Sequence, residues 1–199
     1  MLEEKREKFK GVSQKTGQFF SKLGLTPNQY TLISLLFVVI SFSFLINLNL
    51  VLALIFFLIA TFLDFIDGAV ARFLQKATKR GAYLDTISDR YVEGIILLGF
   101  LFLHLSDFLL PAEVWIFLAL FGSFLTTYSK AAAKEKEIVT EELKKGLLAR
   151  PERIILVFLA ILLGIFNLSW ALYPIIILAI FSNITALQRI YLALRPGQN

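Results

Sequence analysis

Four aspartates, Asp64, Asp67, Asp85 and Asp89, lie within apolar parts of this chain. An ionised side chain inside a membrane-spanning helix costs ~2.5–3.5 kcal/mol on insertion scales, so such a group indicates a function. On helices, the first two are three residues apart and the last two are four apart, so each pair projects from one helix face. Four carboxylates would repel one another without cations, and two divalent ions supply the matching charge. The cluster therefore predicts a two-metal site, which suits phosphoryl transfer because it stabilises the attacking and leaving oxygens.

The composition limits the metals and nucleophiles that the chain can use. It has no cysteine and one histidine, His104, which excludes a thiolate nucleophile, a disulfide framework and a zinc site built from cysteines or several histidines. Oxygen ligands favour hard ions such as magnesium, manganese or calcium. Of the 199 residues, 57% are hydrophobic and the mean hydropathy is +0.74, which predicts lipid as the surrounding solvent.

Six apolar stretches are each long enough to cross a hydrocarbon core of about 30 Å as a helix rising ~1.5 Å per residue. They are residues 29–46, 51–72, 82–105, 112–133, 151–168 and 170–192. The short basic link between the second and third stretches makes these two helices antiparallel neighbours, so that their aspartate pairs face each other. The predicted fold is an all-α integral membrane protein with six transmembrane helices.

The basic residues predict the orientation, because cytoplasmic loops collect positive charge. Of the twenty lysines and arginines, all except Arg90 lie before the first stretch, around the second and fourth connections, or near the carboxyl end. This pattern predicts a multi-pass protein of the cell membrane, with both termini and the active site on the cytoplasmic side. The net charge of +5 is thereby assigned to contact with the membrane surface and not to nucleic acid.

The amino-terminal segment, residues 1–24, mixes apolar side chains such as Phe9, Phe19 and Leu23 with lysines. This pattern predicts an amphipathic juxtamembrane helix on the membrane surface, and a solvated tail is the alternative. Thr26 and Pro27 offer a cap and a first-turn proline, so the first crossing is expected to begin there. Residues 25–195 are predicted to form one six-helix transmembrane catalytic domain.

Eight fixed residues extend the aspartate pattern over residues 64–89, in the order D-x2-D-G-x2-A-R-x8-G-x3-D-x3-D. This run resembles the signature of the CDP-alcohol phosphotransferase family at every fixed position and every gap. The resemblance implies an integral membrane enzyme, usually a homodimer, that moves a phosphatidyl-type group from a CDP-linked lipid to an alcohol and releases CMP. Cytidine recognition rests on this resemblance alone.

The resemblance also implies roles for the motif residues. Two divalent cations, Mg²⁺ or Mn²⁺, would be held by Asp64, Asp67, Asp85 and Asp89. The carboxylate of Asp89 would also act as the general base towards the acceptor hydroxyl. The CDP pocket would comprise Gly68, Ala71, Arg72 and Gly81, together with Asp64 and Asp67. Close helix packing is the alternative role for the small residues, and anchoring of the span is the alternative role for the arginine.

Four cations near the cytoplasmic ends of the later stretches are candidates for binding a phosphorylated polyol acceptor: Lys130, Arg150, Arg153 and Arg189. Arginine suits phosphate because its guanidinium presents a bidentate fork. These positions look similar to the acceptor-phosphate pocket of the branch that makes phosphatidylinositol phosphate or its archaeal ether-lipid counterpart. Inositol phosphate is therefore the favoured soluble acceptor, and membrane anchoring is the alternative role for the four cations.

Two other functions fit parts of the pattern. Ala132 stands where the inositol phosphate branch often has a basic residue. Glycerol 3-phosphate also presents a phosphate near a hydroxyl, so a phosphatidylglycerophosphate synthase-type enzyme is the alternative within the same class. The alternative outside the enzyme class is a divalent-cation transporter, because acidic residues within membrane spans also mark ion pathways. The four aspartates all lie towards one side of the membrane, which favours the enzyme.

Overall fold

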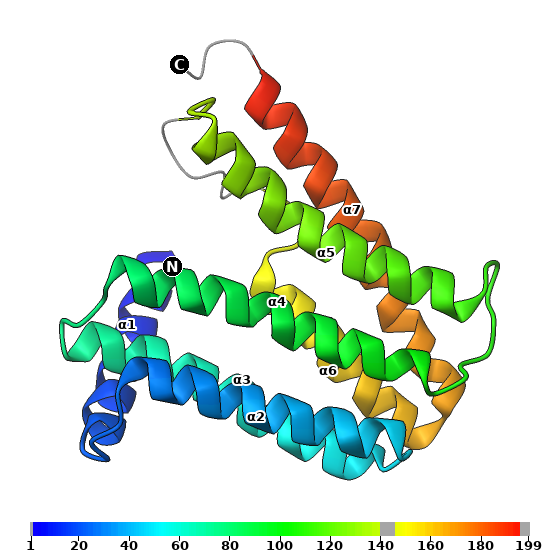
Figure 1. The fold of residues 1–199 in the computed structure, drawn as a ribbon, viewed down its shortest axis with the longest axis horizontal. Helices are drawn as coiled ribbons and strands as arrows, with labels where there is room; N and C mark the ends of the chain where they lie inside the picture. Colours follow the sequence, from blue (N-terminus) through cyan, green and yellow to red (C-terminus); the bar gives the residue numbers. More distant parts are fainter. Residues whose placement is uncertain (1, 140–145, 196–199) are drawn as a thin grey trace.

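The computed structural model describes residues 2–139 and 146–195, and no β-strand occurs within them (Figure 1). In chain order the helices are α1 (Leu2–Ser21), α2 (Pro27–Ile46), α3 (Leu50–Phe73), α4 (Lys79–Leu101), α5 (Ala112–Glu135), α6 (Arg150–Phe166), the short 3₁₀ helix η1 (Leu168–Ala171) and α7 (Leu172–Leu194). The predicted all-α fold class is confirmed, and each predicted stretch corresponds to one of α2 to α7. Thr26 caps α2 and Pro27 lies in its first turn, as predicted.

Among the residues that the structure describes, four segments are long and apolar enough to cross a membrane: α2, α3, α5 and the stretch Leu168–Leu194, which contains η1 and α7. The other two long helices of the predicted domain differ from these. α4 carries four charged side chains between Asp85 and Glu93, and α6 has only 17 residues. The fold is therefore that of a membrane protein with four candidate spans, and six crossings remain a prediction.

The helices pack as two pairs that are joined by α4 and α6. α2 packs along α3, and α5 packs along α7 (Figure 1). α4 lies against α2 and α5, whereas α6 lies against α3 and α7. α3 and α4 both pack along α2, and the aspartates of α3 still meet Asp85 of α4, as the sequence predicted. Helix α2, which has no aspartate, therefore positions α3 and α4, the two helices that carry the aspartates.

Small residues allow the close approach of these helices, as is common between membrane helices. A Cβ atom on Gly99 of α4 would lie 2.6 Å from Leu45 Cδ2 of α2. A Cβ on Gly122 of α5 would lie 2.5 Å from Ser182 Oγ of α7. Since side chains essentially never approach so closely, a larger residue at either glycine would push its helix away from its neighbour.

Helix α1 packs against α3. A Cβ on Gly17 would lie 2.5 Å from the carbonyl oxygen of Ala69, so this approach requires glycine. Where α1 ends, the Tyr30 hydroxyl of α2 donates a hydrogen bond of 2.9 Å to the Phe20 carbonyl. The predicted amino-terminal helix therefore lies beside the aspartate motif, and its location at a membrane surface remains a prediction.

Candidate active site

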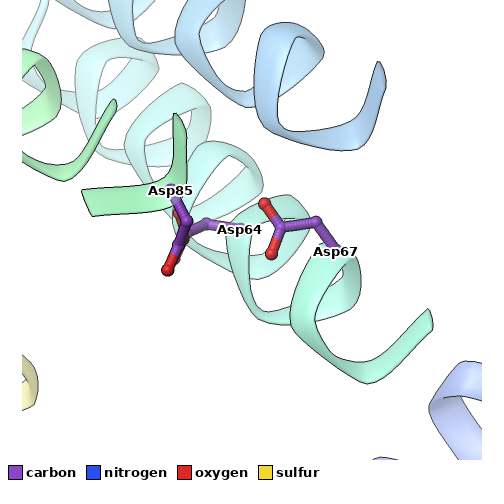
Figure 2. Close-up of side chains that lie close together, drawn as sticks. All are labelled: Asp64, Asp67 and Asp85. Carbon is purple, nitrogen blue, oxygen red and sulfur yellow. The ribbon is translucent and has the colours of Figure 1, made fainter. Parts of the chain in front are cut away.

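Three aspartates from two helices meet at one point. Asp64 and Asp67 lie on α3 and Asp85 lies on α4, and each offers a carboxylate oxygen within 4.8 Å of the others. Figure 2 shows the Asp67 carboxylate turned towards those of Asp64 and Asp85. Asp67 is only 6% exposed, and the other two are partly buried. The structure thus brings together three of the four candidate metal ligands.

The donor atoms of this aspartate cluster suit a hard divalent cation, because Mg²⁺ and Mn²⁺ prefer oxygen ligands. Asp64 Oδ1 is buried, and among the described residues it has no hydrogen-bond partner. A buried oxygen is ordinarily satisfied by a proton donor, a water molecule or an ion. Both observations fit a divalent ion at Asp64, Asp67 and Asp85.

Helix α2 contributes a residue to this cluster that the sequence analysis did not identify. The hydroxyl of Thr31 donates a hydrogen bond of 2.6 Å to Asp67 Oδ2, and both side chains are buried. This bond restrains the rotation of the carboxylate. The available signal was a hydroxyl one turn after Pro27 in a mostly apolar helix, where a buried polar side chain requires a partner.

Arg150 links the fourth aspartate to the cluster. It lies at the start of α6, and its Nη2 donates a hydrogen bond of 2.7 Å to Asp64 Oδ2. The same nitrogen forms an ion pair with Asp89 Oδ1. Asp89 is buried but lies outside the group of three. Arg150 was predicted to bind the acceptor phosphate, and the structure places its guanidinium between two aspartates.

Arg72, a candidate CDP-binding residue, is held by the amino-terminal helix. Its Nε and Nη2 donate hydrogen bonds to Ser13 Oγ of α1 at 3.3 and 2.9 Å. Its Nη1 lies 3.1 Å from the position that a Cβ on Gly68 would take, so the glycine makes room for the guanidinium. Arg72 itself is exposed. The structure therefore leaves its charge accessible beside the aspartates of α3.

The small residues Ala71 and Gly81 keep this neighbourhood open. Ala71 is partly exposed on α3. A Cβ on Gly81 would lie 3.2 Å from Thr78 Oγ1 and 3.5 Å from Asn28 Oδ1 of α2. Thr78 caps α4 by accepting a 3.0 Å hydrogen bond from the Gly81 amide. A side chain at position 81 would crowd these polar groups.

A second buried cluster contains arginines. Arg153 of α6 donates a hydrogen bond of 3.0 Å through Nη1 to the Ser123 carbonyl of α5. Arg189 of α7 donates one of 2.8 Å through Nη1 to the Thr126 carbonyl. The two carbonyls are one helical turn apart, so two of the four candidate acceptor-phosphate residues converge on the same part of α5. Lys130 lies one turn further along α5 and is partly exposed.

Arg90 and Glu93 of α4 complete this arginine cluster, and the sequence analysis did not assign them to a site. Arg90 donates hydrogen bonds to Glu93 Oε2 at 3.0 Å and to Oε1 at 3.2 Å. It also donates one of 3.2 Å to the Ser123 carbonyl. Glu93 Oε1 forms a further ion pair of 3.4 Å with Arg153 Nε. The available signal was an acid three residues after a base, a spacing that pairs side chains on a helix.

The arginine cluster retains unused hydrogen-bonding capacity. Arg90 Nε and Ser123 Oγ are buried, and neither has a hydrogen-bond partner in the part of the chain that the structure describes. Because buried polar atoms are nearly always partnered, each such atom needs an explanation. A polar ligand at this cluster would supply the missing partners.

Comparison with known proteins decides the family. The sequence profile of the CDP-alcohol phosphatidyltransferase family matches residues 24–187, which is most of the chain. The chain belongs to this family. The family and the enzyme class predicted from the aspartate motif are thereby confirmed.

Similar proteins match over nearly the whole length. The archaetidylinositol phosphate synthase of Pyrococcus horikoshii is 36% identical over 192 residues, which cover 96% of this chain and 95% of that protein. The fold is also that of phosphatidylinositol phosphate synthase from Mycobacterium tuberculosis. Its crystal structure with CDP-DAG bound has a TM-score of 0.79 at 24% identity, covering 94% of this chain and 96% of that one. Its crystal structure with manganese and citrate has a TM-score of 0.79 at 25% identity, covering 94% and 91%.

Proposed function

We propose that this family member transfers a phosphatidyl-type group, diacyl or archaeol, from a CDP-linked lipid to a hydroxyl of inositol phosphate and releases CMP. One observation carries the proposal: α6 joins the two clusters. Arg150 contacts Asp64 and Asp89, and one turn later Arg153 contacts Glu93. A donor diphosphate at the aspartates and an acceptor phosphate at the arginines would lie side by side, as group transfer requires.

The metal ligands proposed for this chain are Asp64, Asp67, Asp85 and Asp89, which would hold two divalent ions, Mg²⁺ or Mn²⁺. When bound, such ions stabilise the charge that develops on the attacking and leaving oxygens. The manganese complex of the M. tuberculosis synthase supports a divalent ion here. Thr31 would keep Asp67 oriented as a ligand.

Asp89 is proposed as the general base. Its carboxylate would take the proton of the acceptor hydroxyl while that oxygen forms a bond to the lipid-linked phosphorus. The bond from this phosphorus to the bridging oxygen would break, and CMP would leave. Asp89 suits this role by its position, because it is buried one turn before Glu93 on α4, between the two clusters. A base must reach the acceptor hydroxyl within hydrogen-bond distance.

The remaining candidates are assigned to the two substrates. The CDP pocket is proposed to comprise Gly68, Ala71, Arg72 and Gly81 with Asp64 and Asp67. The acceptor phosphate is proposed to bind Lys130, Arg153 and Arg189, with Arg150 at the boundary between the two substrates. The name of the P. horikoshii relative favours inositol phosphate over glycerol 3-phosphate as the acceptor. Because the same name refers to an archaetidyl lipid, an ether-linked CDP-lipid is the first donor to test.

We further propose six membrane crossings with the active site and both termini in the cytoplasm, an α1 that lies on the membrane surface, and a homodimer.

Between α4 and α5 lies an apolar groove of about 710 Å³, lined by exposed aromatic side chains that include Tyr91 and Phe124. A second copy of the chain is the proposed occupant. Because the chain lacks cysteine, a single Phe124→Cys variant is expected to crosslink as a disulfide dimer in membranes. A Leu32→Cys variant, at an exposed position of α2, is its control and is not expected to crosslink.

The reaction is tested by CMP release from purified protein. The protein is incubated with CDP-archaeol or CDP-diacylglycerol, Mg²⁺ or Mn²⁺, and inositol phosphate, glycerol 3-phosphate or serine in parallel. We expect CMP release with inositol phosphate, and we expect its loss in Asp85→Asn but not in the exposed control Glu113→Gln. Faster release with glycerol 3-phosphate would reassign the acceptor, and no release with any acceptor would refute the proposal.

A further inference from the structure

We infer that Glu93 is a positioning residue for acceptor binding: its carboxylate holds Arg153 and Arg90 in the arrangement that receives the acceptor phosphate. This inference rests on the proposed function. It concerns a residue that would not touch either substrate and that would act only through the two guanidinium groups.

The geometry places Glu93 between two arginines from different helices. Its two carboxylate oxygens accept the forked hydrogen bonds of Arg90 on the same helix, at 3.0 and 3.2 Å. One of these oxygens also pairs with Arg153 Nε on α6 at 3.4 Å. Glu93 is 5% exposed and Arg153 is 4% exposed, so water screens this network only weakly.

The two arginines also converge on one carbonyl group. Arg90 Nη1 and Arg153 Nη1 donate to the Ser123 carbonyl of α5, at 3.2 and 3.0 Å. Two guanidinium groups that share a single acceptor repel each other strongly in a poorly polarisable interior. Glu93 provides the negative charge that lets both remain there. Without it, the two cations are expected to move apart and leave the carbonyl.

Arg153 keeps one donor group available in this arrangement. Glu93 contacts its Nε and the Ser123 carbonyl contacts its Nη1, so the Nη2 amino group is used by neither contact. Arg189 is fixed one turn further along α5 by the Thr126 carbonyl. An acceptor phosphate would meet two guanidinium groups whose directions are already set. Binding is stronger when such groups are held in place before the ligand arrives.

A role in overall stability does not account for this network. Buried ion pairs are costly to desolvate, and apolar replacements of the same volume are often as stable or more stable. A network of two arginines and one glutamate therefore indicates a requirement for a defined arrangement of charges. The neighbouring unpartnered atoms, Arg90 Nε and Ser123 Oγ, indicate that this arrangement faces a polar ligand.

The test compares Glu93→Gln with Glu152→Gln, which removes the same charge from an exposed residue adjacent to Arg153. KM is measured separately for inositol phosphate and for the CDP-lipid. We expect Glu93→Gln to raise the acceptor KM at least about tenfold, which corresponds to about 1.4 kcal/mol, with an unchanged donor KM and unchanged Mn²⁺ affinity. The control variant should match wild type in all three measurements.

Two results would overturn the inference: an acceptor KM equal to that of the control, or an equal rise in both KM values, which indicates general structural damage. If Glu93→Gln does not fold, Glu93→Asp replaces it, because the shorter carboxylate keeps the charge but cannot reach both arginines. The same selective rise in acceptor KM is expected from this variant. A wild-type protein that releases no CMP refutes the proposed function, whereas an active wild type with an unaffected Glu93→Gln refutes only the role of Glu93.

Discussion

Arg150 and Arg153 lie one helical turn apart at the start of α6 and contact two different groups of acids. Arg150 pairs with Asp64 and Asp89, whereas Arg153 pairs with Glu93. Because a single rigid turn separates them, the distance between the aspartate and arginine clusters is set by helix geometry. Two substrates bound at the two clusters would be held at a fixed distance and orientation. Such positioning lowers the activation barrier of a two-substrate reaction.

Removal of the hydroxyl that restrains Asp67 is expected to weaken metal binding. In Thr31→Val, the 2.6 Å hydrogen bond to Asp67 Oδ2 is lost without a large change in volume. Loss of a partner that orients a ligand typically reduces metal affinity about 10–100-fold. Titration of Mn²⁺ followed by electron paramagnetic resonance measures this affinity without turnover.

The controls for Thr31→Val separate orientation from packing. Thr31→Ser keeps the hydroxyl and is expected to bind Mn²⁺ nearly as well as wild type. Thr86→Val removes a hydroxyl that donates a hydrogen bond to the Ala82 carbonyl of its own helix, and its Mn²⁺ affinity should equal that of wild type. Equal Mn²⁺ affinities for Thr31→Val and wild type would show that Asp67 does not depend on this bond.

The proposed base is tested by Asp89→Asn, which keeps the shape of the side chain and removes its ability to accept a proton. We expect binding of the CDP-lipid to persist and CMP release to fall by a factor of about 10²–10⁴, the usual contribution of a general base. Equilibrium binding of a CDP-lipid and single-turnover CMP release measure the two effects separately. Near-normal turnover in this variant would assign the base to another group.

The acceptor pocket is tested by Arg153→Ala and Arg189→Ala. Both guanidinium groups are buried and are fixed by carbonyls of α5, so each is expected to contribute directly to phosphate binding. The apparent affinity for inositol phosphate should fall at least about tenfold in each, since a charge-assisted hydrogen bond contributes ~1.5–3 kcal/mol. Arg195→Ala, at the exposed end of α7, is the control. Unchanged acceptor affinity in both variants would exclude this pocket.

Local sequence signals predicted the helices and the meeting of the aspartates, because apolar run length, caps and residue spacing act over a few residues. The contacts that complete the site are long-range. Thr31 reaches Asp67 across 36 positions, and Arg150 reaches Asp64 across 86. Such contacts depend on how helices cross, which one sequence does not encode locally. For the same reason, the sequence did not indicate that α3 and α4 both pack along α2.

The final prediction concerns the close contact between α1 and α3. In Gly17→Ala, the added methyl group would lie 2.5 Å from the Ala69 carbonyl oxygen and 2.7 Å from Phe73 Cβ, so α1 must move away. Overpacking of this kind typically costs ~1–3 kcal/mol. The displacement would also separate Ser13 from Arg72, so a higher KM for the CDP-lipid is expected together with a lower Tm.

Gly11→Ala is the matched control for this contact, because it lies on the same helix with no atom within 4 Å of the added methyl group. Alanine is a better helix former than glycine by about 0.5–1 kcal/mol, so this variant should be neutral or slightly more stable. Its donor KM should equal that of wild type. If Gly17→Ala behaves like Gly11→Ala in both Tm and donor KM, α1 does not hold Arg72 in place for the donor.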